Sequence, residues 1–375
     1  MSIATKESTF VFLTPWQKTQ AAMLYHFTSI AYLKGLHQMV RDLMSGIVDP
    51  LLEAARAQGR DEVMISEVWG DRNTSHNWEN NAWPFLKDLQ LSLAKDIALR
   101  AAGKFRRTAV NESLRGVAEY SIDWTTPGEE RILQLALATI SEYASEYDTS
   151  VNAYENRWND YRFAYVYPTF ARLNLRTPKF EVRTEFSADT GELAKRTGVY
   201  ISLDDPHASL QFVWSGQEGI KLRSANTFNE IGLAALSFVG RKSLWLDEEK
   251  MFAFATAEPN KRQFHDLVYL YGEPNPRLAP SAIARSAFMS KPCRWALVDI
   301  VPHEYEELDL SIGSEVTQAP VPNRVPAGDR FVEAGFYFAP AAPGSRRRFS
   351  AGETAPSHKS SYGQTFWQWD ENQEK

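Results

Sequence analysis

Side chains suited to nucleophilic chemistry are few in this sequence, and their neighbours do not suggest a catalytic site. A serine, threonine or cysteine nucleophile needs a general base beside it, and the sequence contains no Gly-x-Ser-x-Gly turn. The single cysteine, Cys293, follows a proline at the start of a predicted strand, and no spacing links it to His265 or His303. We expect Cys293 to be a buried structural residue, and we predict that the protein is not an enzyme.

Metal and phosphate sites are not predicted either. The seven histidines are scattered, and no two of them lie four residues apart, the spacing that places two ligands on one helix face. Asp204-Asp205-Pro206-His207 is the densest polar cluster, but adjacent carboxylates point in different directions and Asp-Pro favours a turn. The glycine-rich phosphate-binding motifs are missing from the sequence. We therefore expect neither a metal nor a cofactor.

The charge balance argues against a nucleic-acid partner. The chain has 41 basic and 47 acidic residues, a net charge of −6, and a phosphate backbone repels an acidic protein. Six acidic residues and no lysine or arginine lie between Asp299 and Glu315, in either a solvated loop or a docking surface for a basic partner. The strongest basic run is Arg346-Arg347-Arg348. We expect at least one of these arginines to form an ion pair with an acidic residue. The acidic stretch from Asp299 to Glu315 could supply that residue.

Hydropathy predicts neither export nor membrane insertion. The sequence has no run of about 18 apolar residues that could cross a bilayer. Its first fifteen residues lack a basic segment followed by a long apolar core. A single cysteine also excludes an internal disulfide. Together these features predict a cytoplasmic protein.

Residues 1–176 have the periodicity of helices. Thr14-Pro15 and Thr126-Pro127 each place a capping residue before a proline, a typical helix start. Behind Thr14, apolar residues recur at three- and four-residue spacing as far as Leu43, as on one face of a helix. Further helices are predicted from residues 49 and 83, and the last is predicted over 151–165, ending before Pro168. Five or so helices with short links predict a bundle.

From residue 177 onwards the pattern changes to short alternating segments. Residues 180–186 alternate with a period of two, as in a half-buried strand. One helix is predicted over 228–240. Further strands are predicted over 210–214, 250–255, 267–271, 295–300, 335–339 and 365–369. The sequence thus predicts an α+β protein, with an N-terminal helical bundle over 1–176 and a mixed, β-rich α+β domain over 177–375.

Several motifs in the second half resemble one family. The aromatic run 335–339 is followed by Ser345-Arg346-Arg347, and the chain later reads Tyr362-Gly363-Gln364-Thr365-Phe366-Trp367-Gln368-Trp369. These motifs resemble the C-terminal signature of immunity proteins of bacterial polymorphic toxin systems, the immunity protein 71/72 type linked to the type VI secretion system. The segments 204–206, 210–216 and 228–233 are also similar to the middle of that family, so the likeness covers about residues 198–372.

This sequence departs from the family pattern at two places. Phe331-Val332 stands where the family has Cys-Pro, and Ala339 stands where a threonine is usual. Alternation predicts that Trp367 and Trp369 share one face of a strand and fill a core. We expect the signature residues to be structural and not toxin contacts; they are Arg346, Arg347, Tyr362, Gly363, Trp367 and Trp369.

The resemblance implies a protein that binds a cognate secreted toxin, or effector, and neutralises it, protecting the producing cell from self-intoxication. Toxins that attack nucleic acid are usually basic, so the first candidate toxin-binding surface is acidic: Glu304, Glu306, Glu307 and Asp309. The second candidate is the polar, tryptophan-bearing segment 69–83, with Asp71, Arg72, His76, Trp78 and Glu79. Two alternatives stay open: an adaptor or chaperone that loads an effector onto the secretion apparatus, and an enzyme whose active-site residues meet only in the fold. The oligomeric state is not predicted.

Overall fold

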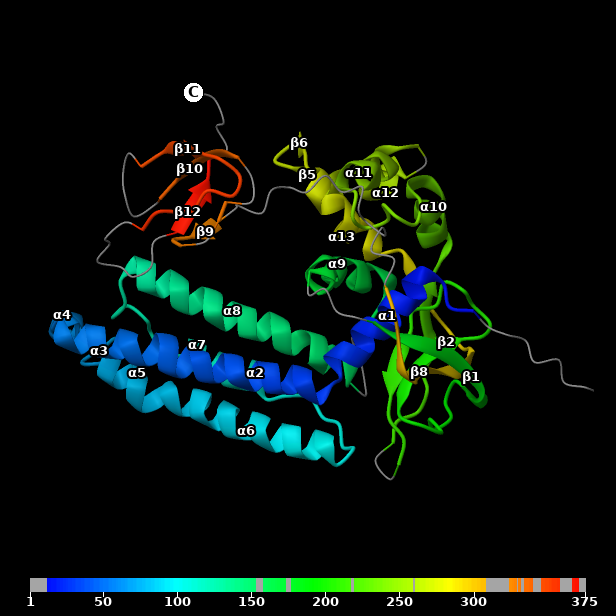
Figure 1. The fold of residues 1–375 in the computed structure, drawn as a ribbon, viewed down its shortest axis with the longest axis horizontal. Coiled ribbons are helices and arrows are strands. Elements are labelled where there is room, and N and C mark those ends of the chain that lie inside the picture. The colour runs from blue at the N-terminus through cyan, green and yellow to red at the C-terminus, as the bar shows by residue number, and fades with distance from the viewer. Residues whose placement is uncertain are drawn as a thin grey trace, which may run out of the picture. The chain divides into compact units, whose positions relative to one another are not determined.

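The computed structural model describes residues 12–152, 158–172, 177–216, 219–258, 260–307, 324–328, 330–331, 334–339, 345–357 and 366–370. The chain divides into two compact units, Met1–Gly313 and Ser314–Lys375. Helices precede most of the strands (Figure 1), so the predicted α+β class is confirmed. The described residues contain no helix that is both long and apolar enough to span a bilayer.

The first half of unit 1 is helical, and its helix starts carry the predicted caps. The helices are α1 (Pro15–Phe27), α2 (Ile30–Leu43), a π-helical turn (Met44–Val48), α3 (Asp49–Ala57), α4 (Arg60–Met64), α5 (Ser75–Asn81), α6 (Trp83–Ala101), α7 (Val110–Ala118), α8 (Pro127–Ser150) and α9 (Asp160–Ala171). Thr14 and Thr126 each form a capping box with the residue three positions later. Such a box satisfies two backbone N–H groups that a helix start leaves free.

Two helix boundaries differ from the sequence-based expectation. The apolar pattern from Pro15 to Leu43 is divided between α1 and α2, because the Ser29 hydroxyl accepts the Tyr32 N–H at 3.1 Å and starts a new helix. The helix predicted over 151–165 is wrong: residues 153–157 lie outside the described part of the chain, and α9 covers 160–171. Pro168 lies within the last turn of α9, where a proline removes one backbone hydrogen bond without ending the helix.

The second half of unit 1 contains an antiparallel sheet and a small helical group. The strand order of the sheet is β1-β8-β2-β3, formed by β1 (Thr177–Asp189), β2 (Gly198–Ser202), β3 (Gln211–Val213) and β8 (Arg294–Glu306). Two further pairs are β4 (Ala225–Phe228) with β7 (Phe288–Lys291), and β5 (Tyr269–Leu270) with β6 (Glu273–Pro274). The helices are α10 (Glu230–Val239), α11 (Glu248–Thr256), α12 (Lys261–Phe264) and α13 (Ala279–Ala284), with short 3₁₀ turns at His265–Leu267 and Pro276–Leu278.

The predicted strand over 250–255 is wrong, because this segment belongs to α11. The Asp247 side chain accepts the Lys250 N–H at 3.0 Å and caps the helix. Glu248 and Glu249 then occupy the first turn, where acidic side chains favour the positive end of the helix dipole. These local signals for a helix start outweigh the short alternation of apolar residues behind them.

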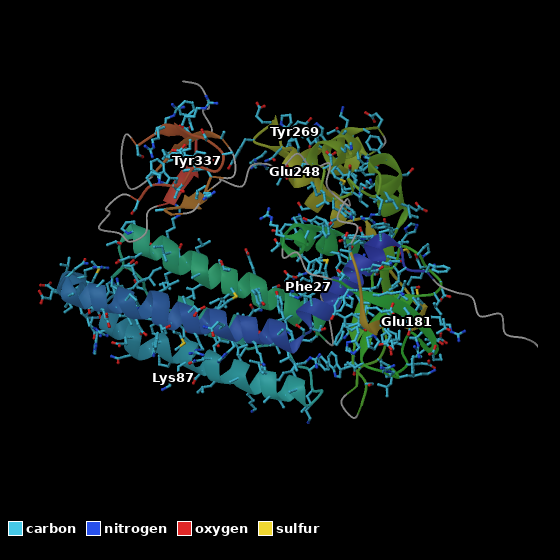
Figure 2. All side chains as sticks on the ribbon, in the orientation of Figure 1. Phe27, Lys87, Glu181, Glu248, Tyr269 and Tyr337 are labelled. Atoms are coloured by element: carbon cyan, nitrogen blue, oxygen red, sulfur yellow. The ribbon has the colours of Figure 1, made fainter. Side chains whose placement is uncertain are left out.

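One hydrophobic cluster of unit 1 contains residues from both the N-terminal helices and the sheet, so residue 176 is not where the compact units divide. The Tyr25 hydroxyl on α1 donates to the Val298 carbonyl at 2.5 Å and accepts the Val199 N–H at 3.3 Å. Phe27, at the end of α1, is buried and stacks on Trp158 with the ring centroids 5.4 Å apart (Figure 2). We expected a boundary near residue 176, whereas the division by compactness falls after Gly313.

A buried carboxylate, Asp160, joins three segments of unit 1. Only 3% of Asp160 is exposed. Its oxygens accept hydrogen bonds from the indole N–H groups of Trp16 and Trp245, each at 2.8 Å. They also accept hydrogen bonds from both terminal nitrogens of Arg241, at 3.0 and 2.6 Å. Trp245 has a left-handed backbone with φ of 70°, a conformation that costs energy in a non-glycine residue. The bond to Asp160 helps to hold α1, α9 and the 241–245 segment together.

Unit 2 is a four-stranded antiparallel sheet with the order β11-β10-β12-β9. Its strands are β9 (Arg324–Pro326), β10 (Gly335–Phe338), β11 (Arg347–Phe349) and β12 (Phe366–Trp369). Its core contains Phe331, Tyr337, Phe349 and Trp367. The rings of Phe331 and Phe349 stack with their centroids 4.0 Å apart. The sequence predicted β10 and β12 but not that this region forms a unit of its own.

Replacing Asp160 with asparagine should destabilise unit 1 by about 3 kcal/mol, because Arg241 would lose its charged partner in a mostly buried site. The measurement is the midpoint of urea denaturation, followed by tryptophan fluorescence. Asp266→Asn serves as a control, because the Asp266 side chain is fully exposed. Equal midpoints for the two variants would contradict the importance of Asp160.

Candidate interaction surface

An exposed apolar group lies at the end of α4 and on the segment that follows it. Val63 is 77% exposed, Ile65 59%, Val68 77% and Trp69 62%. We call these four side chains the apolar tip. A tryptophan among aliphatic side chains is typical of the residues that dominate binding energy at protein interfaces.

A small closed loop holds Val68 and Trp69 outward. Ser66 and Gly70 exchange two backbone hydrogen bonds, of 3.0 and 2.9 Å, and the Ser66 hydroxyl accepts the Trp69 N–H at 2.9 Å. Gly70 has a φ of 57°, the left-handed conformation that glycine adopts without a steric penalty. The loop is therefore closed by its own backbone, and its apolar side chains face away from it.

Two polar contacts anchor the base of this segment. The Asp61 carboxylate accepts the Ser75 N–H and the Ser75 hydroxyl, both at 2.7 Å, so the start of α5 is tied to α4. The Arg60 guanidinium donates to both oxygens of Glu129, at 2.5 and 3.0 Å, and to the Trp124 carbonyl at 3.0 Å. Burial raises the pKa of Glu129, but the hydrogen bonds from Arg60 and Thr126 outweigh it and leave the pKa below its ordinary value.

Exposed acidic side chains lie next to the apolar tip in the sequence. Glu62, Glu67 and Asp71 are exposed, and none of them forms an ion pair with another described residue. The Arg72 guanidinium lies 5.5 Å from the centre of the Trp69 ring, an arrangement typical of a cation–π contact. The surface therefore combines an apolar centre with a mostly negative rim.

The structure supports only part of the second predicted surface, residues 69–83. Asp71, Arg72 and His76 are exposed, and the His76 ring lies 3.0 Å from the Asn80 amide. The expectation that Trp78 contacts a toxin is wrong for this structure. Trp78 is fully buried and packs on Trp124 with the centroids 5.7 Å apart.

Glu79 is half-buried and forms an ion pair with Arg56. Because its charge already has a partner in the chain, Glu79 is less suited than Asp71 to attracting a second molecule.

The first predicted surface, the acidic stretch, begins in the last part of β8 and is partly neutralised. Glu304 pairs with Lys179 at 2.7 Å, and Glu306 pairs with Lys18 at 2.6 Å. Glu307 is exposed, and Asp309 lies outside the described residues. Figure 1 shows α4 at one end of the bundle and β8 in the sheet beyond the other end, so the two predicted surfaces do not form one site.

The signature residues that the structure describes make contacts within unit 2. The Trp367 indole is fully buried and donates to the Pro356 carbonyl at 2.8 Å. Arg346 forms an ion pair with Asp370, and Arg347 lies 4.5 Å from the Phe349 ring centre. Tyr362, Gly363 and the side chain of Trp369 lie outside what the structure describes.

The residues considered for chemistry also have structural roles. Cys293 is a buried free thiol, as expected. Asp205 accepts the His207 N–H at 2.9 Å in the predicted turn, and Asp204 accepts the Arg294 N–H at 2.5 Å. Over the described ranges, no group of three histidine, cysteine or acidic side chains is placed to hold a metal ion.

The sequence reasoning missed Val63, Ile65 and Val68. Ile65, Val68 and Trp69 lie at i, i+3 and i+4, the spacing of a buried helix face, so nothing in the sequence indicated that they are exposed. Comparison with known proteins adds no relative: no protein-family model matches the chain, and no curated protein or solved structure matches it significantly.

The Arg60–Glu129 pair should stabilise the base of the apolar tip in a pH-dependent way. Because folding lowers the pKa of Glu129, its contribution is fully present above the unfolded pKa of about 4.5 and is lost as the pH falls through the folded value. Glu129→Gln should therefore lower stability at pH 7 by about 2 kcal/mol, and by less at pH 3.

Thermal unfolding at the two pH values measures this difference. Glu119→Gln, at an exposed position just after α7, is the control and should have no effect at either pH. If Glu129→Gln lowers the stability as much at pH 3 as at pH 7, the stabilisation comes from packing and not from charge.

Proposed function

We propose that this protein is an immunity protein, which binds a cognate toxin and neutralises it in the cytoplasm of the producing cell, without catalysis. The apolar tip carries this proposal. Four large apolar side chains within seven residues are 59–77% exposed, and exposed clusters of this kind mark interaction sites. The sequence resemblance to immunity proteins indicates that the partner is a secreted toxin.

The rim of the apolar tip favours a basic partner. Glu62, Glu67 and Asp71 place negative charge next to the tip in the sequence, and complementary charge mainly speeds association and selects the partner. A toxin surface with an apolar pocket edged by lysine and arginine fits this arrangement. Trp69 would fill the pocket, while the acidic side chains would face the basic edge.

Trp69→Ala should weaken the complex about thirtyfold, the effect of losing one aromatic anchor. The product of the neighbouring gene, tested as the toxin, is co-expressed with each variant, and growth rescue and the Kd of the purified complex are measured. Leu91→Ala on α6 is a matched control, since Leu91 is 61% exposed, close to the 62% of Trp69. Because both side chains are exposed, neither substitution should change the melting temperature.

Three results of this experiment would separate the hypotheses. If the wild-type chain and Leu91→Ala bind the toxin and rescue growth, and Trp69→Ala is impaired in both, the result supports immunity through the apolar tip. Binding without rescue would indicate an adaptor that loads an effector. If the wild-type chain neither binds nor rescues, the immunity proposal is wrong and an enzyme with a dispersed active site becomes the better hypothesis.

Charge reversal distinguishes the two acidic surfaces. Glu67→Lys with Asp71→Lys should slow association with the toxin about tenfold at low salt, and the effect should shrink at high salt because exposed charges are screened. Glu304→Lys should have little effect, because Glu304 is already paired with Lys179. Stopped-flow association rates at two salt concentrations test this. A larger effect from Glu304→Lys would move the interface to β8.

A further inference from the structure

A cleft of about 470 Å³ lies between α8 and α9. Its lining includes Glu142, Ser145 and Glu146 from α8, and Tyr161, Arg162 and Tyr165 from α9. None of these residues belongs to the apolar tip. The cleft therefore offers a second place where unit 1 could bind another molecule.

One wall of the cleft is acidic. Glu142 and Glu146 are four residues apart on α8, so their side chains lie on the same helix face. Glu146 is mostly buried, and its Oε2 atom has no hydrogen-bond partner among the described residues. The closest charged group, Nη2 of Arg162, is 3.7 Å away, too far for a hydrogen bond. The Oε2 atom of Glu146 therefore has an ion-pair partner but no hydrogen-bond donor in the described part of the chain, which is unusual for a buried oxygen.

The burial of Glu146 affects its protonation. Desolvation raises the pKa of Glu146 to about 7, Arg162 opposes this shift, and Glu142 adds to it. The Tyr32 hydroxyl on α2 also interacts with Glu146. An added positive charge would favour the ionised carboxylate.

The opposite wall is aromatic. The rings of Tyr161 and Tyr165 are tilted at 42° to each other, with their centroids 6.3 Å apart. Tyr161 is held by an edge contact with Trp245 at 5.6 Å, whereas Tyr165 is 73% exposed. The faces of such rings attract cations.

The one arginine of the cleft is engaged with its neighbours. Nη2 of Arg162 donates to the Ser145 hydroxyl at 2.9 Å, and the guanidinium lies 5.1 Å from the centre of the Trp158 ring. Its charge offsets one of the two carboxylates. With both glutamates ionised, the three charged side chains that line the cleft have a net charge of −1, and Arg285 adds a positive charge near Tyr161.

We propose that this cleft binds an organic cation with N–H donors, an alkylammonium or guanidinium group. The donors would meet Glu142 and Glu146 on one side, and the positive charge would face the tyrosine rings on the other. Such a cation could be a free small molecule or the side chain of a lysine or arginine in a protein. The proposal does not depend on toxin binding.

Isothermal titration of the full chain tests the proposal with two probes, n-butylammonium and N-acetyl-argininamide, and with acetate as the anionic control. Saturable binding of at least one cation, and none of acetate, is expected. Glu146→Gln should weaken binding about tenfold, since a hydrogen bond to a charged group is lost. Tyr165→Ala should weaken it about threefold. Glu130→Gln, about three turns away on α8, should leave it unchanged.

The pH dependence gives a second, independent readout. Because cation binding favours ionised Glu146, affinity should rise by up to about tenfold between pH 6 and pH 8. Glu146→Gln should remove this rise, and circular dichroism checks that the variant is folded. Tighter binding of N-acetyl-argininamide indicates a guanidinium ligand, and tighter binding of n-butylammonium indicates a primary alkylammonium ligand; a lysine-containing peptide that binds more weakly than n-butylammonium would indicate a free amine. The proposal would be overturned if neither cation binds. It would also be overturned if the wild-type chain and the Glu146→Gln and Tyr165→Ala variants bind the cation with equal affinity.

Discussion

The carboxylate of Asp160 is the contact on which the arrangement of unit 1 most depends. It accepts hydrogen bonds from residues of α1 and of the segment after α10, and it sits at the start of α9. A buried charge is costly unless donors surround it, and here two indoles and a guanidinium provide them. Segments separated by up to 144 residues therefore have to meet at one point. This requirement joins α1, α9 and the segment after α10.

The fold class and most elements could be predicted from local sequence signals, because caps, prolines and periodicity act over a few residues. Thr126-Pro127 correctly predicted the start of α8, and the alternation at 180–186 correctly predicted part of β1. The extent of the compact units could not be predicted in this way. It depends on contacts such as that between Tyr25 and Val298, 273 residues apart, which leave no pattern in either local segment.

The candidate surfaces were harder to predict, because exposure and pairing are properties of the fold. Trp78 and Trp69 lie nine residues apart in similarly polar surroundings, yet the first is fully buried and the second is 62% exposed. The acidic run from Asp299 to Glu315 predicted a negative surface, but Lys18 and Lys179, from distant segments, neutralise part of it. The cleft between α8 and α9 combines residues that no motif connects.

The backbone closure of the Ser66–Gly70 loop has a consequence for the speed of any encounter. A loop that must become ordered on binding loses conformational entropy at that moment, and this loss weakens the complex. Two backbone hydrogen bonds already fix this loop in the free chain, so Trp69 is presented in advance. Capture of a partner would then not wait for a rearrangement, and its rate would approach the limit set by diffusion and orientation.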